Sequence, residues 1–286
     1  MGTPSVNWVN KYSQDLYHLL QKRGSVWMSG VTVDYDFEGE YKFYNQLDST
    51  TVNQRTSRNQ DTQYNEADHE RRRVSKTLYT SAELFDTWDE INMNLDPTSR
   101  YSESQLLAMG REIDNVLRTA ALGTAYTGKA GGTATSFDTS NQVVTAGSGL
   151  TYQKILETLE LFNTNNVPQQ EEKYFAIGPK QLTKMLESEQ ITSSDYVGLR
   201  PLMAGEVVKW GGFNFILDTE LTTSGNDRYC VAWAKSGIML AMSRGIQTRV
   251  SEMPNKNYAK QIYSEMALGA VRMEEEKVVR IDVDES

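Results

Sequence analysis

A stretch of thirteen residues near the N-terminus, 31–43, alternates between apolar and polar side chains. Its odd positions are apolar except for Gly39, and its even positions are Thr, Asp, Glu or Lys. Because successive side chains of a β-strand point to opposite faces, this pattern predicts one long strand. Thirteen extended residues would span about 43 Å, whereas an ordinary strand has about 5–6 residues. We expect Gly39 to mark a bend or bulge in it.

A long polar stretch follows over residues 45–70, and it offers almost nothing to bury. We expect it to be mobile or to lie flat on a surface. A second strand is predicted over 71–79, with Arg71 and Arg73 facing the acidic side of the first strand. The two strands would form a long arm with a polar tip. Because an isolated hairpin is marginal in water, we expect a neighbouring subunit to cover the apolar face of the arm.

Helical periodicity is strongest over residues 102–122, which carry a continuous apolar stripe. Ser102 and Gln105 have the spacing of a capping box at the start of this helix, and the glycine that follows is expected to end it. Asp114 and Arg118 are four residues apart, and we expect them to pair on the opposite, polar face.

Other regions of the chain carry shorter signals. Apolar residues recur at roughly helical spacing within 1–29, and Ser81 is placed to cap a short helix over 81–92. From about residue 150 helices and strands alternate, and there is no internal repeat. The expected helices are 151–166 and 180–191, and the expected strands are 173–179, 207–221 (bent at its two glycines), 228–242 (as two strands), 245–252, 261–273 and 277–283.

Composition narrows the functional classes. The chain has 286 residues, enough for one large or two modest domains. Its formal net charge of −9 argues against direct, high-affinity nucleic-acid binding, which depends on clustered Lys and Arg. Cys230 is the only cysteine, so an intrachain disulfide is excluded and a reducing compartment is favoured. No apolar run approaches the ~20 residues of a membrane helix, and we expect a soluble, intracellular protein.

The segment GTAYTGKA, residues 123–130, has the beginning of a phosphate-binding loop. Such a loop needs a buried strand before it, a helix after it, and a Ser or Thr after the lysine to hold Mg²⁺. Here a predicted helix precedes the segment, a glycine-rich stretch follows it, and Ala130 stands after Lys129. We therefore reject a nucleotide-binding enzyme acting through Gly123–Lys129, and we expect a helix end followed by a solvated loop.

No other part of the sequence carries a motif for catalysis, cofactor binding or metal binding. His18 and His69, the only histidines, have no metal-ligand spacing to each other or to Cys230. Three consecutive glutamates at 274–276 would point to alternate faces of a strand, so a solvated turn is expected there rather than a metal site. We expect no catalytic, cofactor-binding or metal site.

The order of the predicted elements resembles that of the tailed-bacteriophage major capsid proteins, which have the HK97-like fold. Several short segments also resemble phage capsid sequences, in the expected order from about residue 70 onward. No single segment is diagnostic, and the resemblance rests on their ordered coincidence. The segments are RRRVSKTLYTSAELFD, ALGTAYTG, IGPKQLTKML, ITSSDY, WGGFNFILDTEL and ALGAVRMEEEKVVRI.

This resemblance implies an α+β chain with the HK97-like capsid fold. It would have an N-terminal arm, an extended β-hairpin loop, a peripheral domain with a long spine helix, and an α/β axial domain. The implied boundaries are 1–30 for the N-terminal arm and 31–80 for the extended loop, which contains the two-stranded arm described above. They are 81–149 with 244–276 for the peripheral domain (spine helix 102–122), and 150–243 with 277–286 for the axial domain.

The resemblance also implies a structural protein rather than an enzyme. Such proteins assemble into pentamers and hexamers of an icosahedral shell around packaged double-stranded DNA, without sequence-specific DNA binding and without a membrane. A portal protein and a scaffolding protein are expected partners, a decoration protein is a further candidate, and assembly is expected in the host cytoplasm. Some members carry an N-terminal scaffolding segment that is cleaved off. Only about 30 residues precede the hairpin here, so we expect that segment to be absent or removed.

Contacts between subunits are expected from the apolar face of the arm, from the arginines after its tip, and from the turn of the hairpin 244–276. The candidate residues are Tyr35, Phe37, Tyr41, Phe43, Arg71, Arg72, Arg73, Pro254, Asn255 and Lys256. An encapsulin-type compartment shell has the same fold and is the nearest alternative. A stand-alone oligomeric binding module is a further alternative.

Overall fold

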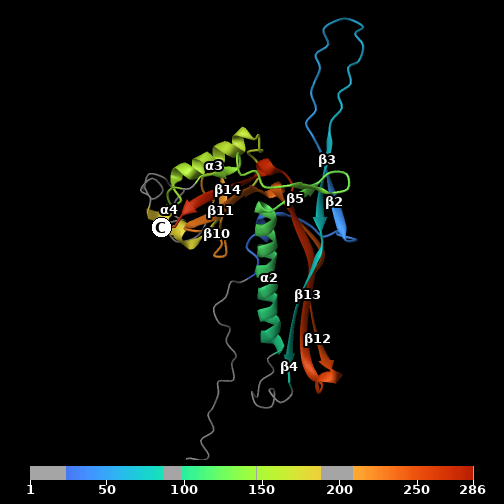
Figure 1. Ribbon diagram of the computed structural model, residues 1–286, viewed down its shortest axis with the longest axis vertical. Helices are drawn as coiled ribbons and strands as arrows, with labels where there is room; N and C mark the ends of the chain where they lie inside the picture. The colour runs from blue at the N-terminus through green and yellow to red at the C-terminus, as the bar shows by residue number, and fades with distance from the viewer. Residues whose placement is uncertain (1–23, 87–97, 146, 188–208, 286) are drawn as a thin grey trace, which may run out of the picture. The chain divides into compact units, whose positions relative to one another are not determined.

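The computed structural model describes residues 24–86, 98–145, 147–187 and 209–285, which form three β-sheets and three α-helices (Figure 1). The α+β class expected from the sequence is confirmed. The chain divides into two compact units, each built from separated segments. One unit comprises Met1–Gly24, Leu78–Glu112 and Arg244–Ala267, and the other comprises Ser25–Thr77, Ile113–Ser243 and Leu268–Ser286.

The largest sheet belongs to the second unit and has the strand order β7-β14-β11-β8-β9, with β10 paired to β11. Its two central apolar segments, β8 and β11, are largely buried, as strands covered on both faces should be. The strands predicted over 173–179 and 277–283 are confirmed. The bounds are β7 Val143–Val144, β8 Lys173–Ile177, β9 Phe213–Leu217, β10 Thr223–Ser224, β11 Asp227–Ala234 and β14 Val278–Asp284.

Two helices accompany this sheet, α3 (Tyr152–Thr164) and α4 (Pro179–Glu187). Thr151 caps α3, because its side chain accepts a hydrogen bond from the backbone N–H of Lys154 at 3.4 Å. Phe162 of α3 packs against Phe213 of β9, with ring centroids 5.9 Å apart. Both helices were predicted; residues 188–191 of the second lie outside the described part of the chain.

A second sheet of the same unit contains the arm and has the order β2-β3-β5-β6. The predicted strand 31–43 is in fact two strands, β1 and β2, which belong to different sheets. Between them Gly39 has a φ of 78°, which no strand residue adopts, so the expected bend is present. The bounds are β1 Thr32–Asp34, β2 Tyr41–Leu47, β3 His69–Ser75, β5 Ala125–Thr127 and β6 Thr133–Thr135.

The segment 123–130 therefore forms a strand and the start of a turn, not only a loop. β5 pairs with β3 on one side and with β6 on the other, so it extends the sheet of the arm. Gly128 and Gly131 adopt positive φ in the turn between β5 and β6, and Lys129 is exposed. With no helix after it, this hairpin lacks the geometry of a phosphate-binding loop.

The third sheet has the order β1-β12-β13-β4. The predicted helix over 81–92 is wrong as far as residue 85, since these residues belong to β4, and residues 87–92 lie outside the described part. Here pairing with β13 overrides the local helix signals. The strands expected at the end of 228–242 and at 245–252 are one continuous strand. The bounds are β4 Thr77–Phe85, β12 Ile238–Met253 and β13 Ala259–Arg272.

Helix α2 (Thr98–Leu122) is longer than predicted. It begins four residues before Ser102, so Ser102 is inside the helix and the capping-box interpretation is wrong. Its buried residues recur every fourth position from Gln105 to Ala121. Asp114 is also fully buried, so the expected surface position of the Asp114–Arg118 pair is wrong as well. The predicted end of the helix at Gly123 is confirmed.

Candidate functional site

The outer face of β2 carries large apolar side chains that its own chain leaves exposed. Tyr41 is 45%, Phe43 37% and Leu47 63% exposed. These are odd-numbered residues, as the alternation requires. The guanidinium of Arg73 lies 4.9 Å from the ring centroid of Tyr41 and 4.7 Å from that of Tyr126 in β5. Aromatic rings and one cation thus form a continuous outward surface on the arm.

The inner face of β2 is attached to its own chain. Lys42 pairs with Asp34 at 2.7 Å, and the Tyr44 hydroxyl donates a hydrogen bond to the same carboxylate at 2.6 Å. These contacts from Lys42 and Tyr44 lower the pKa of Asp34 to about 2. Burial and the neighbouring Asp34 raise the pKa of Tyr44.

A buried apolar cluster holds the base of the arm. It contains Phe37, Val74, Ala125, Ala241 and Val271. Burying a side chain as large as Phe37 contributes about 1.5–3 kcal/mol. The base of the arm is therefore part of the core of its unit, whereas the outer face of β2 is not.

The three arginines after the tip have different surroundings. The ladder pairs Phe43 with Arg73 and Asn45 with Arg71, so these two arginines lie on the aromatic face and not on the predicted acidic face. The register pairs odd residues with odd residues, and a shift of one residue would have been needed for the expected arrangement. Arg72 points inward, is buried, and pairs with Glu275 at 3.2 Å. The side chain of Glu275 is only 17% exposed and pairs with Arg72, so the expectation of a solvated turn at 274–276 is wrong for that residue.

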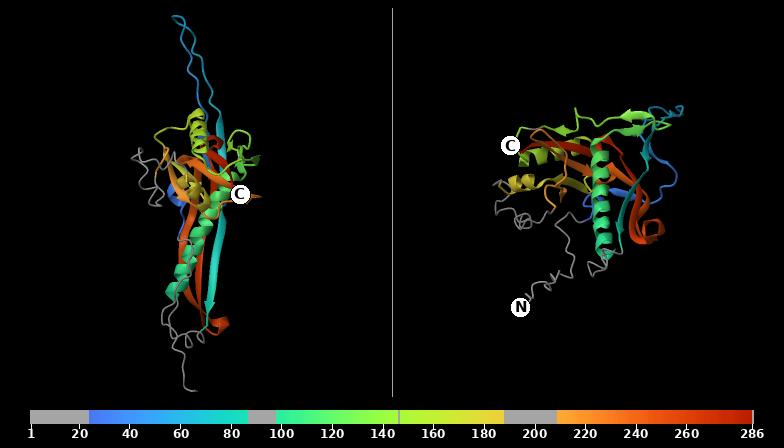
Figure 2. Two further views of the ribbon diagram at one scale, coloured as in Figure 1. Left: turned by 90° about the vertical axis from the view of Figure 1, so that its left-hand side faces the viewer. Right: turned by 60° about the horizontal axis from the view of Figure 1, so that its bottom comes forward.

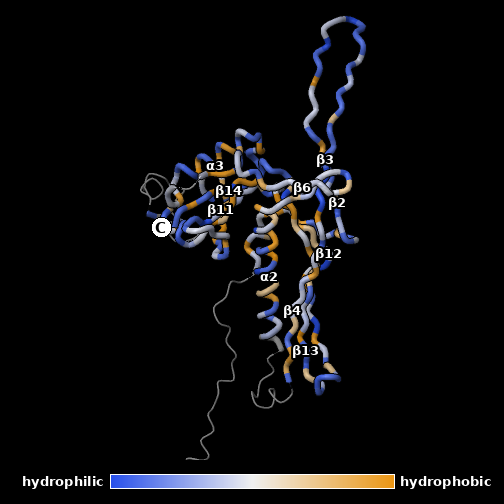
Figure 3. Tube along the Cα trace, in the orientation of Figure 1, coloured by the Kyte–Doolittle hydropathy of each residue, from blue (hydrophilic) through white to orange (hydrophobic). Residues whose placement is uncertain are grey.

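The tip of the arm, residues 48–68, is polar and exposed, and it extends from the sheet as two limbs (Figures 2 and 3). Asp48 donates its backbone N–H to the carbonyl of Asp68 at 3.0 Å, which closes the base of the tip. Its largest apolar side chains, Val52 and Tyr64, are 95% and 88% exposed. The tip therefore buries almost nothing against its own chain.

The turn between β12 and β13 is also exposed, in the other compact unit. Pro254, Asn255 and Lys256 form a single 3₁₀ turn, and Asn257 and Tyr258 follow with positive φ. Tyr258 donates its N–H to the carbonyl of Met253 at 3.1 Å, which closes the turn.

Seven of the ten candidate contact residues are exposed, and three are not. Phe37 and Arg72 are buried within their own chain, and Arg73 is half-buried beneath Tyr41 and Tyr126. The exposed candidates are Tyr35, Tyr41, Phe43, Arg71, Pro254, Asn255 and Lys256. Leu47 and Tyr64 are also exposed, but the sequence did not indicate them because they lie in a polar stretch.

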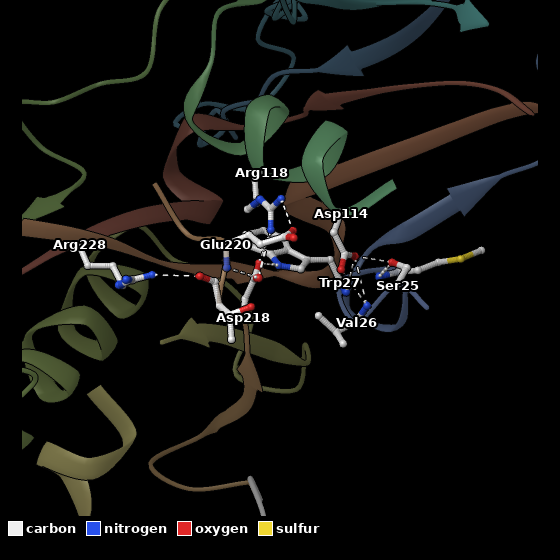
Figure 4. A network of polar contacts seen from close by, with 10 residues as sticks. Ser25, Val26, Trp27, Asp114, Arg118, Asp218, Glu220 and Arg228 are labelled. Carbon is white, nitrogen blue, oxygen red and sulfur yellow. Dashed lines mark hydrogen bonds and ion pairs between the residues drawn. The ribbon is translucent and has the colours of Figure 1, made fainter. Parts of the chain in front are cut away.

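A polar network that the sequence did not predict anchors residues 25–30 (Figure 4). Asp114 accepts hydrogen bonds from the Ser25 hydroxyl at 2.5 Å and from the backbone N–H groups of Val26 and Trp27 at 3.1 Å. The Trp27 ring stacks on Trp233 with centroids 4.2 Å apart. The segment is thereby attached to α2 on one side and to the large sheet on the other.

Asp218 continues this network. It is fully buried and accepts hydrogen bonds from the Trp27 indole at 2.7 Å and from Arg118 at 2.9 Å. Arg118 also pairs with Glu220 at 3.0 Å. Burial acts to lower the pKa of Arg118, but the two carboxylates outweigh it and the pKa is raised. These groups hold each other in place through hydrogen bonds and ion pairs.

The described residues contain no group of His, Cys, Asp and Glu that could hold a metal ion. Burial raises the pKa of the Cys230 thiol to about 12, so this cysteine is protonated and unreactive at neutral pH. None of the helices in the described part of the chain is long and apolar enough to span a membrane.

Comparisons with known proteins agree with this arrangement. The family model for "Phage capsid protein" matches residues 5–285. The capsid protein of cyanophage P-SCSP1u has a similar structure, with a TM-score of 0.75, 15% sequence identity, and coverage of 100% of this chain and 96% of that chain. No curated protein sequence matches the chain.

Two further solved structures share the fold. The head structure of Helicobacter pylori bacteriophage KHP40 has a TM-score of 0.75 and 9% identity, and covers 100% of this chain and 99% of that chain. A solved structure from Mycobacterium phage Che8 has a TM-score of 0.71 and 15% identity, and covers 96% of this chain and 97% of that chain. The family match over nearly the whole sequence, together with this shared fold, shows that the chain belongs to the phage capsid protein family and is a major capsid protein with the HK97-like fold.

Proposed function

We propose that this virion protein assembles into pentamers and hexamers of an icosahedral shell that encloses packaged double-stranded DNA, and that its arm lies over an adjacent subunit. The observation that carries the proposal is the outer face of β2. Phe43 and Leu47 are exposed on a strand whose inner face is already attached to its own chain. Covering each such side chain contributes up to about 1.5–3 kcal/mol.

In a shell, this stabilisation is repeated at every subunit. Every subunit would offer one arm and receive another, so contacts that are individually modest together stabilise a closed assembly. Symmetry also explains why a hydrophobic surface is tolerated on the arm, since it is covered in every subunit of a closed shell. The candidate residues of the arm are accordingly Tyr35, Tyr41, Phe43 and Arg71, together with Leu47.

The remaining segments receive roles by the same proposal. Residues 31–80 act as the extended loop, 81–149 with 244–276 as the peripheral domain, and 150–243 with 277–286 as the axial domain around five-fold and six-fold axes. The turn Pro254–Lys256 meets its copies near three-fold positions. The N-terminal arm is 1–30.

The charge of the chain suits a container for DNA. A net charge of −9 repels packaged DNA and leaves it free to exit, without sequence-specific contact. We propose a portal protein and a scaffolding protein as partners, with a decoration protein as a further one. Assembly takes place in the host cytoplasm, and the protein has no enzymatic activity.

The double variant Phe43→Ser/Leu47→Ser tests the role of the outer face. It should remain folded, because neither side chain is in the buried cluster at the base of the arm, but shells should no longer form. Asn45→Ser is the matched control, because Asn45 is exposed on the same face between the two and adds no apolar surface. Circular dichroism reports folding, and sedimentation with negative-stain microscopy reports shells. Normal shells from the double variant would overturn the proposed role of the arm.

A further inference from the structure

One carboxylate, that of Glu275, contacts two arginines from distant parts of the chain. Arg72 lies in β3 of the arm and donates through Nη1 to Glu275 at 3.2 Å. Arg272 lies at the end of β13 and donates through Nε to the other oxygen of Glu275 at 2.6 Å. We call Gln46, Arg72, Arg272 and Glu275 the Glu275 cluster. All four residues belong to the same compact unit.

Arg272 connects the cluster to the C-terminal end of α2. It is fully buried, and its Nη1 donates to the carbonyls of Ala121 and Gly123 at 2.8 and 2.7 Å. Ala121 is in the last turn of α2 and Gly123 directly follows the helix, and carbonyls at a helix C-terminus lack a partner within the helix and favour a cation. Burial lowers the pKa of Arg272, and the contact with Glu275 opposes that effect.

Arg72 and Gln46 connect the cluster to the arm. The Nε of Arg72 donates to Gln46 Oε1 at 3.3 Å, and Gln46 Nε2 donates to the carbonyl of Met273 at 2.8 Å. Both strands of the arm therefore contact the same short segment, 273–275. The member of the buried cluster on β3 is Val74, two residues nearer the base than Arg72, while Tyr44, opposite Arg72 in the ladder, packs against the cluster as a partly buried side chain.

The charges in the cluster do not balance without Glu275. Two buried guanidinium groups share its carboxylate, and within the described part of the chain the other carboxylate near Arg72 is that of Glu70, which is largely exposed and 4.0 Å away. Without the carboxylate, two buried cations would remain close together. We would then expect Arg72 to move away, because it lies on the arm. Arg272 would stay in place, because two carbonyls at the helix end hold it.

We propose that Glu275 is a positioning residue for assembly: by holding Arg72 and Arg272 together, it fixes the direction in which the arm leaves its sheet. This inference rests on the proposed role of the arm. The partner it prepares for is a second copy of this chain.

Hydrogen exchange on unassembled Glu275→Gln protein tests the positioning. We expect exchange to rise at least tenfold in 41–47 and 69–75 and to stay unchanged in 227–234 and 278–284. Glu276→Gln is the matched control, because it removes the same charge from the adjacent, exposed residue and should change neither region. Unchanged exchange in the arm, or an equal rise in the large sheet, would overturn the proposal.

Two further variants keep the test decisive. Glu275→Gln/Arg72→Gln removes one cation as well as the carboxylate, and should return much of the lost protection to the arm. If Glu275→Gln does not fold, Arg72→Gln alone releases the arm while Arg272 keeps its partner, and the same rise in exchange is expected.

Shell yield separates the two proposals. A loose arm with reduced shell yield supports both. A loose arm with normal shell yield would overturn the role of Glu275 in assembly but leave the proposed function of the arm standing, because the Phe43→Ser/Leu47→Ser variant tests that function separately.

Discussion

At the scale of single residues, buried charges in this protein are shared between segments far apart in sequence. Asp114 accepts from the backbone of Trp27, and Asp218 from its indole, across 87 and 191 residues of sequence respectively. Glu275 joins two arginines in the same way. A buried carboxylate is costly unless its acceptor sites are filled, so each of these contacts specifies one arrangement of its partners.

Replacing Asp218 with Ala should cost much more stability than replacing Glu220 with Ala, although both carboxylates pair with Arg118. Asp218 is fully buried and also accepts from Trp27, so its loss leaves a cation and an indole N–H without that acceptor. We expect a loss of about 3–5 kcal/mol for Asp218→Ala and less than about 1 kcal/mol for Glu220→Ala. Urea unfolding of the unassembled chain measures both, and equal losses would contradict the importance of the network.

Acid should weaken the attachment of β2 through Asp34. Its pKa is lowered from 3.8 to about 2 in the folded chain, mainly by Lys42 and Tyr44. A lowered folded-state pKa gives stability that is complete above the unfolded pKa and is lost as the pH falls from about 4 to about 2. The difference in urea midpoint between wild type and Asp34→Asn should therefore be largest near neutral pH and shrink toward pH ~2. A difference that is constant with pH would show that the Asp34 charge contributes nothing.

At the scale of elements, the sequence predicted those whose signal is local. The predicted helix 151–166 and the predicted strands 173–179 and 277–283 correspond to α3, β8 and β14. The break between β1 and β2 was not predictable in full, because the alternation continues through residues 35–40 while the backbone turns. Ser81 had the local features of a helix cap, yet its segment pairs as a strand with β13.

The contact surface was predictable only in outline. Alternation identified the aromatic face with Tyr41 and Phe43, but it placed Phe37 on the same surface. Phe37 is buried instead, because the bend at Gly39 changes which face of the chain points outward. The register of β2 and β3 decided the surroundings of Arg71 and Arg73, and register is a property of two strands. The partners of Trp27, and Arg72 as a partner of Glu275, lie too far away in sequence for any local pattern to indicate.

The turn between β5 and β6 offers a test of how the arm packs on its sheet. At Gly131, which has a φ of 64°, an added Cβ would lie 2.9 Å from Arg73 Cβ and 3.0 Å from a ring carbon of Phe43. Gly132 has nothing within 4 Å of such an atom and a φ outside the left-handed region. We expect Gly131→Ala to cost about 1–3 kcal/mol and Gly132→Ala less than about 0.5 kcal/mol by urea unfolding. Equal effects would show that the turn does not pack on the arm.

At the scale of the whole molecule, the chain separates the contacts that hold the arm from the surfaces that its own residues leave exposed. The inner face of β2 and the base of β3 are attached within one compact unit, whereas the outer face and the tip leave apolar side chains exposed. In the proposed shell, neighbouring subunits would cover these exposed side chains, and the many such contacts would add up.

Chains lacking the tip should therefore interfere with normal ones. Replacing residues 49–67 with Asn-Gly leaves β2 and β3 intact, because the contact between Asp48 and Asp68 already closes that point, and the favoured two-residue turn suits the strands. Such a subunit would still receive a neighbour's arm and would keep the outer face of β2, but it could not contribute the contacts of its own tip. When it is expressed together with wild type in equal amounts, we expect incorporation and a shell yield well below half of normal, because closure requires nearly every contact. Wild type expressed with Lys129→Ala, which changes only an exposed side chain, is the control and should assemble normally. A yield of about half would mean that the shortened chains are excluded, and normal shells from shortened chains alone would show that the tip is not needed.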